Sequence, residues 1–133
     1  PHTLEEKDQV YTKAPSGGPL VQHALVVMME AVKNGKITVE KMVQKMCHNP
    51  AILFRIEKRG FVREGYYADL VIVDPNVPQT VSSDIILYKC GWSPFEGQSF
   101  TSSVTHTFVN GNLVYKEGVL YGDEKGRRLL FNR

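Results

Sequence analysis

The sequence predicts an α/β protein, with helices in its first half and strands in its second. Apolar residues recur at three- and four-residue steps between Pro19 and Gly35, which is the period of a helix. After Gly60 the apolar period changes to two, as in strands. Asn110-Gly111 joins two β-prone runs, and Asn-Gly is the strongest short-range signal of a hairpin.

The composition indicates a globular domain without an extended charged surface. The 133 residues carry a formal charge of only +2, and Lys and Arg are scattered among Asp and Glu. We therefore expect no nucleic-acid partner. The longest apolar run, 24–29, is far shorter than the ~20 residues of a membrane span. Two cysteines, Cys47 and Cys90, fit reduced thiols better than a disulfide framework, which favours a cytoplasmic protein.

Two helices are expected in the first half. The first starts with Pro19, whose missing N–H suits a first turn, and ends at Asn34-Gly35. It carries His23, which we expect to be a core or interface residue. The second follows an N-cap at Thr38 and ends at 49–50, because the residue before Pro is pushed out of the α region. A short helical turn over 51–54 follows. The expected buried stripe of the second helix is Val39, Met42, Val43, Met46 and Cys47.

Strands are expected in the second half. Residues 68–74 predict a buried strand, and 85–88 a second candidate. The hairpin strands are 104–109 and 112–116, and Glu117-Gly118 ends the latter. Asp69 is expected to order a turn, and the apolar tail 127–131 needs a covering surface.

These elements make a poor autonomous core, because no strong strand precedes the first helix to complete a parallel βα unit. The chain also begins Pro1-His2-Thr3, which looks like the middle of a motif. We therefore expect these residues to be the C-terminal piece of a larger enzyme, with the rest of the same polypeptide as a partner.

Several stretches resemble one family, the dihydroorotases of the amidohydrolase superfamily. Residues 1–3 resemble the end of its Thr-Asp-x-Ala-Pro-His loop. Residues 60–74, Gly-Phe-Val-Arg-Glu-Gly-Tyr-Tyr-Ala-Asp-Leu-Val-Ile-Val-Asp, are similar to its Gly-x-Ile-x-x-Gly-x-x-Ala-Asp-Leu-Val-Ile-x-Asp segment. Residues 93–97, Ser-Pro-Phe-Glu-Gly, and 107–111, Thr-Phe-Val-Asn-Gly, resemble the closing β segment.

The resemblance implies the C-terminal end of a (β/α)₈ barrel followed by the C-terminal strands of a small β-sandwich. Residues 1–59 would form the barrel part, including the last two outer helices, and residues 60–133 the sandwich part. The implied activity is zinc-dependent, reversible hydrolysis of L-dihydroorotate to N-carbamoyl-L-aspartate in pyrimidine synthesis.

The same resemblance implies where the site residues lie. His2 would contact the substrate carboxylate, and Ser16 and Gly17 would supply main-chain contacts. The general acid/base Asp would sit just upstream of Pro1, and zinc would be bound by residues outside this chain. We therefore expect no catalytic residue and no metal ligand here, and an inactive isolated chain. Cys47-His48 alone is a weak zinc signal, since Cys90 and His106 are distant in sequence.

Three alternatives remain open. The enzyme could be a hydantoinase- or allantoinase-type cyclic amidohydrolase, or the domain could be a non-catalytic, dihydroorotase-like structural or assembly domain. A third is a small β module that binds a partner through Trp92 and Phe95. Trp92 to Phe95 otherwise predicts an aromatic packing cluster, or a subunit interface if the protein is a homo-oligomer.

Overall fold

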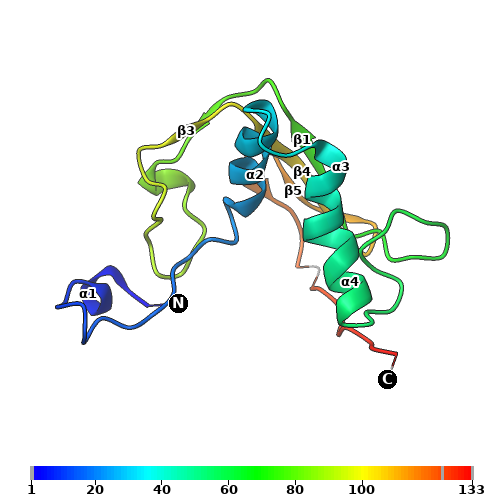
Figure 1. The fold of residues 1–133 in the computed structure, drawn as a ribbon, viewed down its shortest axis with the longest axis horizontal. Helices are drawn as coiled ribbons and strands as arrows, with labels where there is room; N and C mark the ends of the chain where they lie inside the picture. Colours follow the sequence, from blue (N-terminus) through cyan, green and yellow to red (C-terminus); the bar gives the residue numbers. More distant parts are fainter. Residues whose placement is uncertain (1, 124, 133) are drawn as a thin grey trace. The chain divides into compact units, whose positions relative to one another are not determined.

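The computed structural model describes residues 2–123 and 125–132, so Pro1 of the predicted Pro-His motif lies outside the described residues. The chain divides into two compact units (Figure 1). The first comprises Pro1–Glu30 and Pro75–Ser103, and the second comprises Ala31–Asp74 and Val104–Arg133. The predicted boundary between residues 59 and 60 concerns the parent fold and stays a prediction.

The first unit begins with α1 (Leu4–Lys7), a single helical turn. Thr3 is its N-cap and forms a capping box with Glu6, in which each side chain bonds the other residue's backbone N–H. This box satisfies two N–H groups that the start of a helix leaves unpaired. The turn that follows His2 is thus fixed by local polar contacts.

The helix predicted from Pro19 is α2 (Ala24–Lys33), so the predicted start was wrong. The residues just before it form a turn, in which the N–H groups of His23 and Ala24 bond to the Leu20 carbonyl, and side-chain contacts also hold this segment. The side chain of Gln22 binds the Ile85 carbonyl at 2.7 Å and the Leu87 N–H at 2.9 Å, and its own N–H donates to the Tyr88 hydroxyl.

The same contacts explain why no strand forms over 85–88, where one was predicted. A 3₁₀ turn, η2 (Ser83–Ile85), and irregular chain occupy this segment. Its polar backbone groups at 85 and 87 bond to Gln22 and therefore need no neighbouring strand. The unit's sheet has two short strands, β2 (Gln79–Thr80) and β3 (Ser99–Phe100), which pair antiparallel.

A small core surrounds His23, which is 2% exposed, as expected for a core histidine. Its ring packs edge-on against Tyr88 and Phe95, and its Nδ1 lies 3.2 Å from Oγ of buried Ser93. Its Nε2 is buried and has no hydrogen-bond partner among the described residues. Apolar residues complete this core: Val26, Val81 and Phe100.

In the second unit, α3 (Val39–Val43), η1 (Gln44–His48) and α4 (Asn49–Leu53) follow one another as one helical column (Figure 1). The predicted N-cap is confirmed, because Thr38 accepts a bond from the Lys41 N–H. The predicted break at 49–50 was wrong. A wide π turn over η1 lets the Asn49 N–H bond the Gln44 carbonyl, and Pro50 then falls in the first turn of α4, which tolerates it.

The predicted buried stripe of this column is confirmed only at Met42, which is 5% exposed. Val43 is half-buried, whereas Val39, Met46 and Cys47 are exposed, so their predicted burial was wrong within this chain. Periodicity identified the helix, but the described residues offer no cover for most of that face.

Four strands form the second unit's sheet in the order β1-β4-β5-β6: β1 (Leu70–Asp74), β4 (Ser103–Val109), β5 (Asn112–Lys116) and β6 (Val119–Leu120). The Asn110-Gly111 hairpin is confirmed, and both residues have the positive φ that a type I′ turn needs, 51° and 85°. Glu117-Gly118, predicted to end a strand, also turns the chain into β6. The predicted burial of β1 was wrong, since this edge strand exposes Leu70, Val71 and Ile72.

Asp69 has the structural role that was expected. Its carboxylate accepts the Asn110 N–H at 2.8 Å and pairs with Arg59, so it ties the hairpin turn to the chain before β1. The tail is anchored by the Glu57 N–H, which donates to the Leu130 carbonyl at 2.9 Å, and Phe131 pairs with Ile56. None of the described helices has the length and apolar character needed to cross a bilayer.

Gly60 should be far less replaceable than Gly65, although both have nearly the same positive φ, 78° and 79°. A Cβ at Gly60 would overlap Ala51 and lie 2.7 Å from the Cys47 carbonyl oxygen, whereas none of the described atoms lies within 4 Å of a Cβ at Gly65. Both Ala variants are destabilised by backbone strain at a positive φ. Gly60→Ala should lower the unfolding free energy by about 1–3 kcal/mol more than Gly65→Ala. Urea titration of the two variants checks this, and equal losses would contradict it.

His23 should make stability depend on pH. Burial lowers the pKa of His23 below its ordinary value, because the charged ring would lose water without gaining an acceptor at Nε2. Below about pH 6.5 the unfolded chain binds a proton that the folded chain excludes, so stability falls as the pH falls. Melting temperatures at about pH 7.5 and pH 5 should differ more in the wild type than in His23→Gln. His106→Gln is the matched control, and an unchanged pH response in His23→Gln would refute the prediction.

Candidate substrate-binding site

The three site residues predicted from the sequence line one cavity in the first unit. His2, Ser16 and Gly17 share it with Gly18 and Pro19, and its volume is about 260 Å³. His2 precedes the N-cap of α1, and the other four belong to the loop that leads toward α2. Residues 14 positions apart in sequence are thereby brought together at one small, open site.

The backbone of His2 is held by Trp92. The indole Nε1 donates to the His2 carbonyl oxygen at 2.9 Å. The same indole lies beside Gly18, since a Cβ built there would be 3.9 Å from Cη2 of Trp92. Trp92 therefore binds the His2 wall of the cavity and lies next to the Gly18 wall, although it is 90 residues from His2 in sequence.

The imidazole of His2 is oriented by Glu6. Its Nδ1 lies 3.4 Å from Oε2 of Glu6, and the same oxygen accepts the Thr3 N–H at 2.8 Å. The Thr3 backbone bond lowers the pKa of Glu6, and the neighbouring His2 lowers it further, so this carboxylate is ionised near neutral pH. With Nδ1–H donating to Glu6, Nε2 can donate to an anion only when the ring is an imidazolium.

The loop opposite His2 presents free backbone donors. The N–H groups of Ser16, Gly17 and Gly18 bond to no described residue, and all three residues are exposed. Gly17 has φ 89°, a conformation that a side chain rarely adopts. The loop is also held by Lys7, whose Nζ donates to the carbonyls of Pro15 and Gly17, the latter at 2.7 Å.

This arrangement can bind a small anion but offers no reaction centre of its own. It combines an imidazole, which carries positive charge when protonated, with backbone N–H groups, the donors that carboxylates accept. The described part of the chain places no carboxylate, cysteine or lysine amine on the lining of this cavity.

The described residues do not fit a zinc site. No group of three or more His, Cys, Asp or Glu side chains within residues 2–123 and 125–132 could hold a metal ion. Cys47 is exposed. The ring of neighbouring His48 stacks on the ring of Phe61, with 4.3 Å between the ring centroids.

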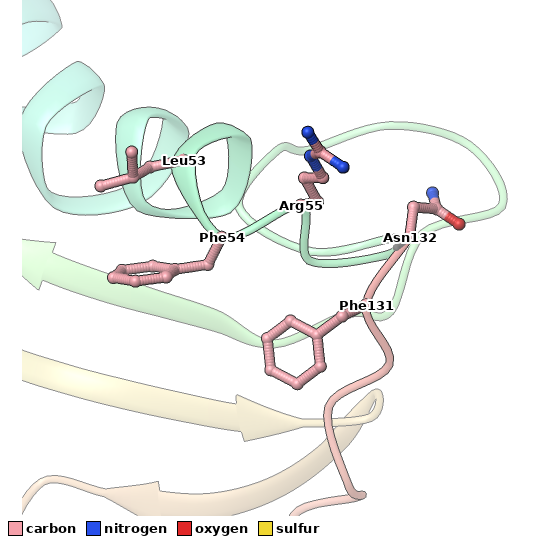
Figure 2. Close-up of a pocket in the computed structure, with 5 residues that line it drawn as sticks. All are labelled: Leu53, Phe54, Arg55, Phe131 and Asn132. Carbon is pink, nitrogen blue, oxygen red and sulfur yellow. The ribbon is translucent and has the colours of Figure 1, made fainter.

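A larger cavity of about 440 Å³ lies in the second unit (Figure 2). Figure 2 shows the rings of Phe54 and Phe131 on one side, while the polar ends of Arg55 and Asn132 point away from them. The described residues of its lining include no nucleophile and no acid/base group, since the Arg55 guanidinium keeps its proton, so the cavity does not compete with the His2 site as a place for chemistry.

Sequence reasoning missed three residues that build the site. Glu6 stands three residues after Thr3, so the capping-box pattern was a usable signal. Lys7 gave no signal, since its carbonyl partners are irregular loop backbone. Trp92 was expected in an aromatic cluster; Phe95 does pack against His23 and Phe100, but Trp92 acts through its N–H.

Comparison with known proteins matches residues 12–114 to the Amidohydrolase family. The dihydroorotase of Pyrococcus furiosus is 35% identical over 130 residues, which cover 98% of this chain and 30% of that protein. The dihydroorotase of Clostridium acetobutylicum is 36% identical over 118 residues, covering 88% of this chain and 28% of that protein. The chain thus spans less than a third of the length of these relatives.

Solved structures of hydantoinases share the fold. The L-hydantoinase of Arthrobacter aurescens matches with a TM-score of 0.75 and 30% identity, covering 84% of this chain and 25% of that one. The dihydropyrimidinase of Brevibacillus agri matches with a TM-score of 0.80 and 26% identity, covering 90% and 27%. Together with the family match and the dihydroorotase relatives, these likenesses show that the chain belongs to the amidohydrolase family, as a dihydroorotase-like member.

Proposed function

We propose that this chain forms part of a dihydroorotase. In that enzyme its His2 site binds the carboxylate of L-dihydroorotate or N-carbamoyl-L-aspartate. The observation that carries the proposal is the cavity that brings His2 together with Ser16 and Gly17. The similarity to dihydroorotases over nearly the whole chain supports it independently. Because the chain spans about 30% of those relatives, the activity is proposed for the protein that contains these residues together with a metal centre.

The role of His2 follows from its contacts. Glu6 holds Nδ1, so the protonated ring presents Nε2–H to the ligand as a charge-assisted donor. The Ser16 and Gly17 N–H groups add neutral donors across the cavity. Fixing the carboxylate end of the substrate in this way orients the rest of the molecule. Orientation alone can lower the activation barrier by several kcal/mol.

The metal and the acid/base Asp are proposed to come from polypeptide outside these 133 residues. The resemblance to dihydroorotases suggests zinc, and the described residues supply no cluster that could replace those ligands. The chain's own contribution is therefore binding and orientation. In the same proposal, residues 1–59 close a (β/α)₈ barrel and residues 60–133 complete a β-sandwich.

The alternatives differ in what the substrate carries at this site. Hydantoins and dihydropyrimidines, the ligands that the names of the structural relatives suggest, lack the ring carboxylate that His2 would bind. Turnover of L-dihydroorotate in preference to hydantoin and dihydrouracil supports the dihydroorotase. The reverse preference supports the hydantoinase type, and no turnover of any of them supports a non-catalytic domain. A homo-oligomer stays a prediction that native mass measurement can test.

His2→Ala should raise KM for L-dihydroorotate in the complete protein. A hydrogen bond to a charged group contributes about 1.5–3 kcal/mol, which corresponds to a roughly 10- to 100-fold change. Zinc content should stay near that of the wild type, because no metal-binding group includes His2 among the described residues. Steady-state kinetics and metal analysis provide the measurements, with His106→Ala as a histidine control in β4. An unchanged KM would remove His2 from the site.

The 133-residue chain by itself should bind no zinc in stoichiometric amount and should not hydrolyse dihydroorotate. The reason is that its described histidines, cysteines and carboxylates form no group of ligands. Metal analysis of the chain purified without chelator tests the first half, and a coupled hydrolysis assay tests the second. One equivalent of tightly held zinc would contradict the prediction.

A further inference from the structure

We propose that Lys7 is a positioning residue that prepares the loop N–H groups of Ser16 and Gly18 to receive a carboxylate. Lys7 does not line the cavity of His2. It lines a separate cavity together with Pro15 and Ser16, and its Nζ donates to the carbonyls of Pro15 and Gly17. The inference rests on the proposed function for the identity of the ligand, whereas the loop geometry is independent of it.

The two carbonyls that Lys7 binds are the partners of specific N–H groups. The Pro15 carbonyl belongs to the same peptide unit as the Ser16 N–H, and the Gly17 carbonyl to the same unit as the Gly18 N–H. A cation on a carbonyl oxygen polarises its peptide and makes the N–H at the other end a stronger donor. Ser16 and Gly18 both line the cavity, so the N–H groups that Lys7 strengthens belong to residues that border the ligand.

The contacts also fix the shape of the loop. One ammonium group joins carbonyls two residues apart, so the chain must curl around it, and Gly17 between them adopts φ 89°. None of the three residues 16–18 makes a hydrogen bond from its backbone to the backbone of another described residue, and all are exposed. Without Lys7 this segment has little else to hold it, and a mobile loop pays an ordering cost when it binds a ligand.

Lys7 is itself well placed for this task. It is the last residue of α1, which the Thr3–Glu6 capping box fixes, and it is half-buried, unlike the exposed Lys13. The same short helix also carries Glu6, which orients His2. One helical turn therefore positions both walls of the cavity. Its Glu6 carboxylate contacts the His2 ring, and its Lys7 ammonium binds the carbonyls of the loop.

The test uses equilibrium binding of orotate and uracil to the complete protein. Orotate carries the ring carboxylate and uracil lacks it. Both rings keep the C5–C6 double bond that dihydroorotate lacks, so we expect neither to be hydrolysed during the measurement. We expect Lys7→Met to weaken orotate binding about 10-fold, as for loss of one good ligand contact, and to leave uracil binding unchanged. Lys7→Arg should restore most of the orotate affinity, because a guanidinium can also donate to two carbonyls.

Lys13→Met is the matched control, because it removes the same charge from the same segment and its side chain makes no hydrogen bond or ion pair within the described chain. It should leave both affinities unchanged. Hydrogen exchange of the 14–18 segment should rise in Lys7→Met and not in Lys13→Met. Three outcomes would overturn the inference. Lys7→Met could bind orotate as tightly as the wild type, it could lose uracil affinity as much as orotate affinity, or the wild type could fail to bind orotate.

Turnover of dihydroorotate, measured separately, distinguishes the two proposals. Selective loss of orotate affinity in Lys7→Met without any turnover by the wild type would sustain the role of Lys7 and reject the proposed activity. Normal turnover with no selective loss would sustain the activity and reject the role of Lys7.

Discussion

The hydrogen bond from the Trp92 indole to the His2 carbonyl is the contact on which the candidate site depends most. The segment around His2 has almost no apolar anchor, since Leu4 is 61% exposed and α1 buries no residue. A segment without a core must be ordered by polar contacts. Trp92 supplies the one that joins it to a distant part of the first unit, and the capping box makes the following turn rigid. The imidazole can then be aimed by Glu6, because the backbone that carries it is already fixed.

The fold was predictable from the sequence where local chemistry decides the conformation. Thr38 caps a helix, and Asn110-Gly111 forms a hairpin turn, because these residues satisfy or permit specific backbone geometries. The predictions failed where a side chain distant in sequence forms hydrogen bonds with the backbone groups of the predicted element. Gln22 occupies the polar groups at 85 and 87, which no periodicity of either segment can show. Pro50 was misjudged because a π turn removes the helical bond that proline would otherwise break.

The candidate site was predicted only through the resemblance. Taken alone, His2 is an ordinary histidine and Ser16-Gly17 an ordinary loop, since neither residue type nor spacing distinguishes them. The structure adds the reason they can act together, which is that they line one cavity. The residues that hold them in place could not be found in this way. Lys7 recognises carbonyls rather than side chains, and backbone carbonyls carry no signature in a sequence.

Burial shows most clearly what a local pattern cannot determine. The helical column of the second unit has the apolar period that was expected, yet Val39, Ile52 and Leu53 are 47%, 64% and 74% exposed. The edge strand β1 has an apolar sequence and exposes three of its residues in the same way. An apolar stripe indicates that an element is suited to burial. Which surface covers the stripe depends on other parts of the fold. The Thr38 cap and the Asn110-Gly111 turn form without such cover, because they need only a few neighbouring residues. The conformation of these elements is therefore set locally, whereas the burial of their apolar faces requires surfaces that the described residues do not provide.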